Sequence, residues 1–162
     1  MKFQANIEVE SEEGMRRLGQ QLSALIAPQD VVYLSGDLGV GKTTLARALI
    51  QACGFHGRVK SPTYGLVETY PTDRGPLAHL DLYRLGSAEE IHDLGLESYL
   101  DQNMRILIEW PERALSYLPA PDWQITITDS DCLDTNQSKD ASYRLVFIEA
   151  KGHPIDLDPV FA

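Results

Sequence analysis

A glycine-rich run in the first third of the chain carries the clearest chemical signal. Residues 36–43 read Gly-Asp-Leu-Gly-Val-Gly-Lys-Thr and fit the pattern G-x-x-x-x-G-K-[ST] without a mismatch. Glycines let the backbone curl so that successive N–H groups point at phosphate oxygens. The ammonium of Lys42 suits the β and γ phosphates, and the hydroxyl of Thr43 can ligate Mg²⁺. The run therefore predicts a P-loop that binds a nucleoside triphosphate with Mg²⁺, in preference to a plain turn before a helix. The predicted nucleotide-binding residues are Gly36, Asp37, Leu38, Gly39, Val40, Gly41, Lys42, Thr43 and Thr44.

A magnesium site also needs carboxylate oxygens, and two acids are candidates. Residues 106–109, Ile-Leu-Ile-Glu, have the Walker B form, in which an apolar strand delivers an acid at its carboxyl end. Glu109 is therefore predicted to hold or organise Mg²⁺, in preference to being a solvated strand-end acid. Asp81 shares one face of another predicted strand with His79 and Tyr83, while the alternate positions are apolar. We expect the apolar face to pack on the core and Asp81 to be exposed, either towards the site or simply to solvent.

Two further positions are each open to two interpretations. Ser61 and Thr63 flank Pro62 ahead of a predicted hairpin, at the distance of a switch segment, and Thr63 could offer its hydroxyl to Mg²⁺ or the γ phosphate. The same segment could equally be a loop-to-strand junction. Trp110 follows Glu109 and either belongs to the core, which is the default for tryptophan, or covers the site.

The elements that must hold these residues follow from hydrophobic periodicity. Strands are expected at 3–9, 31–34, 64–70, 77–83, 105–110, 123–128 and 143–150. Helices are expected from an N-cap at Ser11 to Pro28, from Lys42 to Cys53 with Gly54 as cap, after an N-cap at Ser87, and from Pro111 through Tyr117. The turn-rich residues 71–76 predict a β-hairpin.

The fold class that this order predicts is α/β. We expect a single P-loop NTPase-like domain over residues 1–162, with a mixed parallel and antiparallel central sheet flanked by helices. Residues 130–142 are expected to form a loop, and residues 151–162 a C-terminal tail.

Composition disfavours several classes of function. The 14 Lys and Arg are outnumbered by 24 Asp and Glu, the net charge is −10, and the basic residues do not cluster, so an autonomous nucleic-acid binder is not expected. No apolar run approaches the ~20 residues that span a bilayer and no secretory leader is evident, so we expect a cytoplasmic protein without membrane contact.

Cysteines occur at positions 53 and 132 and are expected to be lone thiols. Neither N-K-x-D nor D-x-x-G occurs, which argues against ordinary GTPase base recognition, and no arginine-dense kinase lid is evident.

Four motifs together resemble the bacterial TsaE (YjeE) family, the ATPases of tRNA threonylcarbamoyladenosine biosynthesis. They are the P-loop run, Ser61-Pro62-Thr63-Tyr64, His79-Leu80-Asp81-Leu82-Tyr83-Arg84 and Leu107-Ile108-Glu109-Trp110, in the family's order and spacing from about residue 8 to about residue 118. The resemblance implies a small cytoplasmic ATPase that assists a TsaB–TsaD protein pair. That pair installs threonylcarbamoyl on the adenosine beside the anticodon in tRNAs reading codons that begin with A, so tRNA is met indirectly through the complex. The resemblance also implies that Thr43 and Glu109 hold Mg²⁺ and that Asp81 acts near the attacking water or the metal.

Three hypotheses for the function follow. The leading one is partner-activated ATP hydrolysis with Lys42, Asp81 and Glu109 as catalytic residues and with Thr43, Asp81 and Glu109 as the candidates for binding Mg²⁺. A second is a nucleotide-gated binding module, in which ATP occupancy orders residues 61–63 for docking. A third is a small-molecule phosphotransferase, which the absent lid disfavours. The adenine pocket is expected to involve the junction at Glu10 and Ser11.

Overall fold

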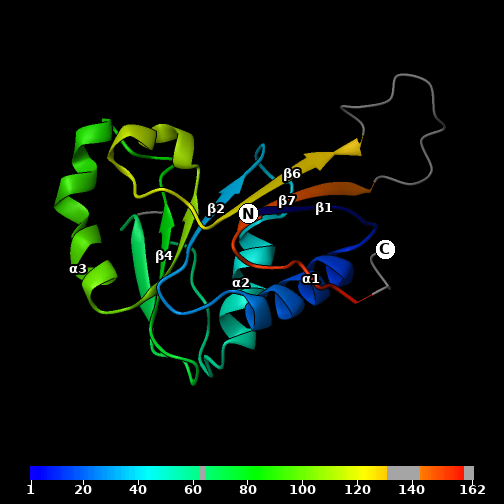
Figure 1. Ribbon diagram of the computed structural model, residues 1–162. Coiled ribbons are helices and arrows are strands. Elements are labelled where there is room, and N and C mark those ends of the chain that lie inside the picture. Colours follow the sequence, from blue (N-terminus) through cyan, green and yellow to red (C-terminus); the bar gives the residue numbers. More distant parts are fainter. Residues whose placement is uncertain (63–64, 131–142, 159–162) are drawn as a thin grey trace.

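A seven-stranded mixed sheet runs through the whole chain. The computed structural model describes residues 1–62, 65–130 and 143–158. The strand order is β1-β7-β6-β2-β5-β4-β3, and β6, β2, β5 and β4 run parallel to one another, whereas β1, β7 and β3 are antiparallel to their neighbours (Figure 1). The strands are β1 Lys2–Val9, β2 Val31–Ser35, β3 Val67–Tyr70, β4 Leu77–Asp81, β5 Arg105–Glu109, β6 Trp123–Asp129 and β7 Arg144–Lys151. The predicted α/β class with a mixed sheet is confirmed.

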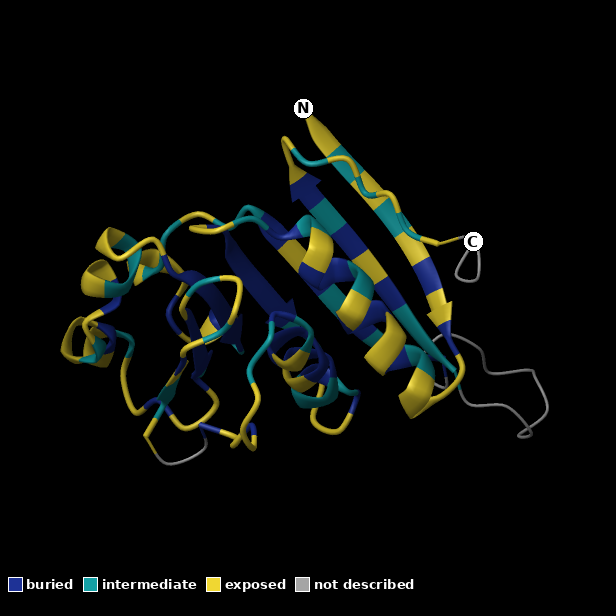
Figure 2. Ribbon diagram, turned by 90° about the horizontal axis from the view of Figure 1, so that it is seen from below, coloured by how far each residue is buried: buried dark blue, intermediate teal, exposed yellow. Residues whose placement is uncertain are grey.

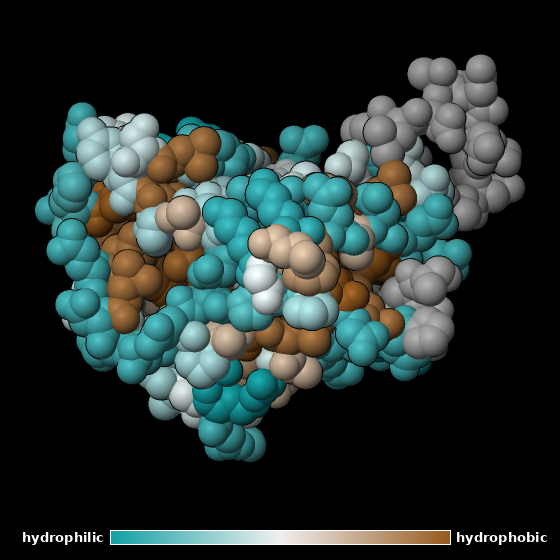
Figure 3. Space-filling view, viewed as in Figure 1, coloured by the Kyte–Doolittle hydropathy of each residue, from teal (hydrophilic) through white to brown (hydrophobic). Residues whose placement is uncertain are grey.

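Helices cover both faces of this sheet. On one face lie α1 (Glu12–Leu25) and α2 (Lys42–Ala52), which pack against each other and against the alternate residues Val32 and Leu34 of β2 (Figure 1). The opposite face is covered by α3 (Leu96–Asp101) and three short 3₁₀ helices, η1 (Ala88–Leu94), η2 (Pro111–Arg113) and η3 (Leu115–Tyr117). Figure 3 shows apolar atoms gathered beside α3, where this second, thinner layer meets the sheet.

The central strands are buried along almost their whole length because both of their faces are covered. All five residues of β5 are buried, whereas β1, β6 and β7 alternate between buried and more exposed positions, as Figure 2 shows. This difference is the usual one between a parallel strand between two helix layers and a strand with one open face. In the part of the chain that the structure describes, no helix is both long and apolar enough to cross a membrane.

Helices α1 and α2 begin and end close to the positions that the sequence predicts. The Ser11 hydroxyl accepts the Gly14 N–H at 3.0 Å, which caps α1, and α1 ends shortly before Pro28. Helix α2 begins at Lys42, and after it Gly54 has φ = 95°, a left-handed conformation that suits glycine after a helix.

Several predicted boundaries are wrong. Strand β3 begins at Val67 instead of residue 64, and β4 ends at Asp81 because the Asp81 carboxylate accepts the Tyr83 N–H at 3.0 Å and closes a local turn. The Ser87 side chain makes no capping bond within the described residues, and the helix after it is a 3₁₀ helix. The helix predicted from Pro111 is two 3₁₀ turns, because the non-helical φ of −150° at Ala114 interrupts it. Helix α3 was not predicted.

The described residues after β7 fold back onto α1. Lys151 belongs to β7, so the tail begins one residue later than predicted. Ile155 and Leu157 pack against the core on the α1 side, and the Asp158 N–H donates to the Gln21 side chain at 2.8 Å. The predicted loop at 130–142 lies outside the described residues except for Ser130, whose N–H donates to the Tyr143 carbonyl at 3.0 Å.

Candidate active site

The glycine-rich loop connects the carboxyl end of β2 to the amino end of α2. Gly36, Gly39 and Gly41 have φ values of 144°, 76° and 113°, which L side chains rarely adopt. A Cβ at Gly36 would also lie 2.4 Å from the Ile127 carbonyl oxygen, so glycine is required there on steric grounds. Among the described residues no side chain caps the start of α2. Its first N–H groups and its helix dipole therefore favour an anion at this position.

Lys42 lies folded back over this loop. Its side chain is 5% exposed, and Nζ donates to the Gly36 carbonyl and, at 2.8 Å, to the Asp37 carbonyl. Nζ also lies 4.2 Å from the centroid of the Trp110 ring. Burial lowers the pKa of Lys42, and the nearby carboxylates, Glu109 first, partly offset that effect. A buried ammonium whose ligands are neutral carbonyls and a ring face is suited to exchange them for phosphate oxygens.

Two carboxylates from adjacent parallel strands meet beside the loop. Asp81 of β4 is paired in register with Glu109 of β5, so both side chains leave the sheet at the same edge and on the same face. Glu109 is 1% exposed, and its Oε1 accepts the Thr43 hydroxyl at 3.1 Å. A cavity of about 390 Å³ is lined by Lys42, Thr43, Asp81 and Glu109 together with parts of the loop. The structure therefore brings the predicted catalytic and metal-binding side chains to one place.

The remaining sequence-predicted residues have mixed outcomes. Leu38 and Thr44 line the same cavity, and so does Trp110, which is half-buried and stacks on Tyr83 with ring centroids 4.9 Å apart. Trp110 also packs against the core cluster of the α3 layer, so it lies at the edge of the core and covers the site, and each of the two interpretations holds in part. Ser61 is exposed and lines neither of the two cavities at the loop, and Thr63 lies outside the described residues.

His79 differs most from its expected environment. The polar face of β4 was predicted to be exposed, yet His79 is 0% exposed, because α2 covers this face of the sheet as the other layer covers the opposite face. Its Nε2 lies 2.7 Å from Glu109 Oε2. The signal that could have located it is the predicted sheet flanked by helices, since a central strand of such a sheet is covered on both faces.

Asp81 is half-buried, and this position raises the pKa of its carboxyl group. The main cause is burial, which the Tyr83 N–H partly offsets by donating to the carboxylate; Glu109 raises the pKa further, and His79 and Lys42 lower it. The ionised carboxylate is therefore held at the site at some expense of stability.

Asp81→Asn is expected to raise the melting temperature at pH 7 by roughly 1–4 °C, since 1 kcal/mol corresponds to about 2–4 °C for a domain of this size. Because the folded-state pKa of Asp81 is raised, its contribution to the stability of the folded state is fully present below the unfolded-state pKa. That contribution is lost as the pH rises through the folded-state pKa and the carboxylate ionises. The gain of the asparagine variant should therefore shrink as the pH falls below about 4. Thermal denaturation at pH 7 and below pH ~4, with EDTA and without nucleotide, measures this gain in melting temperature. An equal gain at the two pH values would contradict a raised pKa for Asp81.

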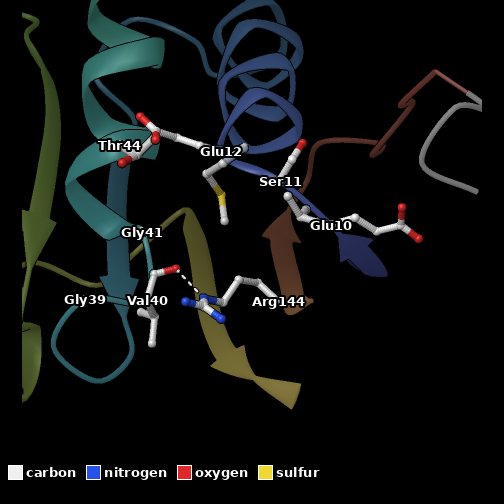
Figure 4. A pocket seen from close by; sticks show the side chains of 10 residues that line it. Glu10, Ser11, Glu12, Gly39, Val40, Gly41, Thr44 and Arg144 are labelled. Carbon is white, nitrogen blue, oxygen red and sulfur yellow. Dashed lines mark hydrogen bonds between the residues drawn. The ribbon is translucent and has the colours of Figure 1, made fainter. Parts of the chain in front are cut away.

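A second cavity of about 320 Å³ lies on the other side of the loop. Figure 4 shows it between the loop, the start of α1 and β7, with the Arg144 side chain directed at the loop and the Glu10 carboxylate directed away from it. Arg144 Nε donates to the Val40 carbonyl at 3.3 Å, and its guanidinium pairs with Asp129 at 2.9 Å. Ser11 lines this cavity, as expected for the strand–helix junction. Arg144 was not predicted, because nothing in the pattern of β7 separates it from an ordinary strand-end arginine.

Comparison with known proteins identifies the family. A sequence model described as "Threonylcarbamoyl adenosine biosynthesis protein TsaE" matches residues 9–138. The "tRNA threonylcarbamoyladenosine biosynthesis protein TsaE" of Rickettsia bellii is 41% identical over 133 residues, which cover 78% of this chain and 92% of that protein. The protein of the same name from Aquifex aeolicus is 33% identical over 146 residues, which cover 89% and 99%.

A solved structure has the same fold. The crystal structure of Bacillus subtilus YdiB matches with a TM-score of 0.68 at 27% identity, covering 94% of this chain and 88% of that one. The family match spans the glycine-rich loop, Asp81 and Glu109, and it ends before Arg144. The chain belongs to the TsaE family of tRNA threonylcarbamoyladenosine biosynthesis proteins.

Proposed function

We propose that this protein is a cytoplasmic, partner-activated ATPase that hydrolyses Mg-ATP during threonylcarbamoylation of tRNA. The observation that carries the proposal is the convergence of Lys42, Thr43, Asp81 and Glu109 on one cavity at the start of α2. A cation, a hydroxyl and two carboxylates beside an uncapped helix start form a set suited to a triphosphate and its metal.

The residues present fit Mg²⁺ as the metal. The Thr43 hydroxyl and a Glu109 oxygen lie 3.1 Å apart, and Asp81 lines the same cavity, so three oxygen donors face one region. Within the described residues no group of three or more His, Cys, Asp and Glu side chains could hold a metal by itself. That agrees with Mg²⁺, which is usually held by one or two carboxylates together with substrate phosphates. When bound with ATP, Mg²⁺ neutralises charge on the β and γ phosphates.

The two carboxylates are proposed to have different roles. Both oxygens of Glu109 are engaged, one by Thr43 and the other by His79, and the residue is 1% exposed, which suits a fixed group that organises the metal. Asp81 is more exposed and lines the cavity, and its raised pKa suits a carboxylate that accepts a proton from the attacking water. Lys42 and the loop N–H groups stabilise the charge that develops on the phosphates.

The cavity lined by Ser11 and Arg144 is proposed to receive the adenine and ribose. It shares Gly39, Gly41 and Thr44 with the cavity that contains Lys42, so the two lie on either side of one loop. A nucleotide placed across the loop would have its phosphates on one side and its base on the other. The walls of the cavity that contains Ser11 and Arg144 combine the apolar Val9 and Met15 with polar side chains, as is usual for small-molecule sites.

The proposed partner is the TsaB–TsaD pair, with tRNA reached through that complex. Support comes from the family's role in threonylcarbamoyladenosine biosynthesis and from the net charge of −10, which does not suit a protein that binds tRNA phosphates alone.

Inorganic phosphate release from Mg-ATP, measured with and without purified TsaB–TsaD, tests the proposal. We expect slow release from the isolated protein, a clear increase with the pair, and loss of that increase for Lys42→Ala. Release that the pair leaves unchanged would break the proposed link to the partner. If a slowly hydrolysed ATP analogue sustained repeated rounds of tRNA modification, a nucleotide-gated binding module would be favoured instead.

A further inference from the structure

His79 and Glu109 form a buried polar pair, and the proposed function gives a role to Glu109 but none to His79. His79 is 0% exposed and Glu109 is 1% exposed, and the two side chains approach to 2.7 Å between Nε2 and Oε2. The other oxygen of Glu109 accepts the Thr43 hydroxyl. We propose that His79 is a positioning residue that fixes the Glu109 carboxylate for Mg²⁺ binding. This inference rests on the proposed role of Glu109.

The direction of the hydrogen bond follows from the chemistry of the two groups. An ionised carboxylate only accepts hydrogen bonds, so Nε2 of His79 must carry the proton that is shared with Oε2. The opposite oxygen is engaged by Thr43 from α2. With one donor on each side, the carboxylate plane has a defined rotation, and Oε1 is kept beside the Thr43 hydroxyl. Without the histidine, the Glu109 side chain would keep one of these two donors and would lose that fixed rotation.

The fold explains why the donor must come from this position. His79 pairs in register with Leu107 of β5, two residues before Glu109, so the histidine and the glutamate share the face that α2 covers. An imidazole at this position reaches diagonally to the strand end, where β5 delivers its acid. Nε2 of His79 is not a metal ligand in this arrangement, because Glu109 occupies it, and Nδ1 is buried without a hydrogen-bond partner among the described residues.

The competing explanation is that His79 only fills the core and satisfies a buried carboxylate. A structural role would affect stability, whereas a positioning role would affect the response to Mg²⁺. Groups that orient metal-binding residues typically contribute about 10–100-fold to metal affinity or activity. The test therefore has to measure Mg²⁺ dependence separately from folding and from turnover.

The proposed experiment measures binding of a fluorescent, non-hydrolysable ATP analogue as Mg²⁺ is titrated, beginning in EDTA. His79→Leu is expected to raise the Mg²⁺ concentration for half-maximal enhancement of binding by about 10–100-fold. The variant should still bind the analogue in EDTA. His79→Gln should restore most of the Mg²⁺ response, because the glutamine amide nitrogen can occupy the place of Nε2, whereas His79→Asn places its nitrogen nearer Nδ1 and should not.

Leu77→Ala serves as the matched control for lost stability. Leu77 is fully buried on the same strand and the same face, and it lines neither cavity. It should lower the melting temperature and leave the Mg²⁺ response as in the wild type. If His79→Leu does not fold, the comparison of His79→Gln with His79→Asn still decides the question.

The outcomes separate the inference from the function on which it rests. A wild-type protein whose affinity for the analogue does not respond to Mg²⁺ would overturn the metal role of Glu109 itself. A wild-type response that persists unchanged in His79→Leu or in His79→Asn would overturn only the positioning role. Failure of His79→Gln to restore the response, or an equal shift in Leu77→Ala, would also overturn it and would assign His79 to packing.

Discussion

Lys42→Ala is expected to lower ATP hydrolysis by about 10²–10³-fold, the loss typical when one group that stabilises transition-state charge is removed. The Lys42 ammonium, at the start of α2, donates hydrogen bonds to the carbonyls of Gly36 and Asp37. Nothing in an alanine side chain replaces its charge at the β and γ phosphates. Phosphate release at saturating Mg-ATP measures the effect, in the presence of the partner pair so that the wild-type rate is high.

Stability provides the control for this variant. Burial lowers the pKa of Lys42, so the charged side chain is held in the folded protein at some expense of free energy. We therefore expect the melting temperature of Lys42→Ala without nucleotide not to fall. A loss of activity accompanied by a large drop in melting temperature would point to misfolding instead of a missing charge. Near-wild-type hydrolysis would remove Lys42 from the mechanism.

Glu109→Gln is expected to lower Mg²⁺-dependent hydrolysis by at least about 10²-fold, because loss of a metal-binding group should exceed the loss seen for groups that only support one. The amide has nearly the shape of the carboxylate, and its oxygen can still accept the Thr43 hydroxyl. It has no negative charge for the metal. Rates measured across a range of Mg²⁺ concentrations should show a weaker response to the ion as well as a lower maximum.

Glu112→Gln is the matched control for Glu109→Gln. Glu112 lies close enough to raise the pKa of Lys42, but it is exposed on η2 and lines neither cavity. The same change in charge at this position should leave hydrolysis close to that of the wild type. Equal losses in the two variants would mean that the net charge around Lys42 matters, and not a specific bond from Glu109 to the metal.

The sequence was most informative where local rules and tertiary packing favour the same structure. The glycine-rich loop, the cap at Ser11 and the acid at the end of β5 each have a local signature, and each lies where it was predicted. Their meeting at one edge of the sheet also follows from parallel strands, whose carboxyl ends lie together.

Prediction was wrong where a residue's surroundings come from distant parts of the chain. Periodicity places His79 on a polar face, but whether that face meets water depends on α2, which covers it. Arg144 reaches the loop only because β7 lies next to β6 in the sheet. The helices predicted after Ser87 and from Pro111 are 3₁₀ helices instead of α-helices, and α3 was missed, since such short elements leave little periodic signal.

The pairing of β1 with β7 has a consequence for folding during synthesis. Residues 2–9 leave the ribosome early, yet their only strand partner in the sheet, among the described residues, spans residues 144–151. At a translation rate of about 5–20 residues per second, β1 waits on the order of ten seconds for that partner. Such long sequence separation favours slow closure of this edge. Since Arg144 arrives with β7, the wall of the second cavity is completed late, and the nascent chain has its glycine-rich loop well before it has the whole site.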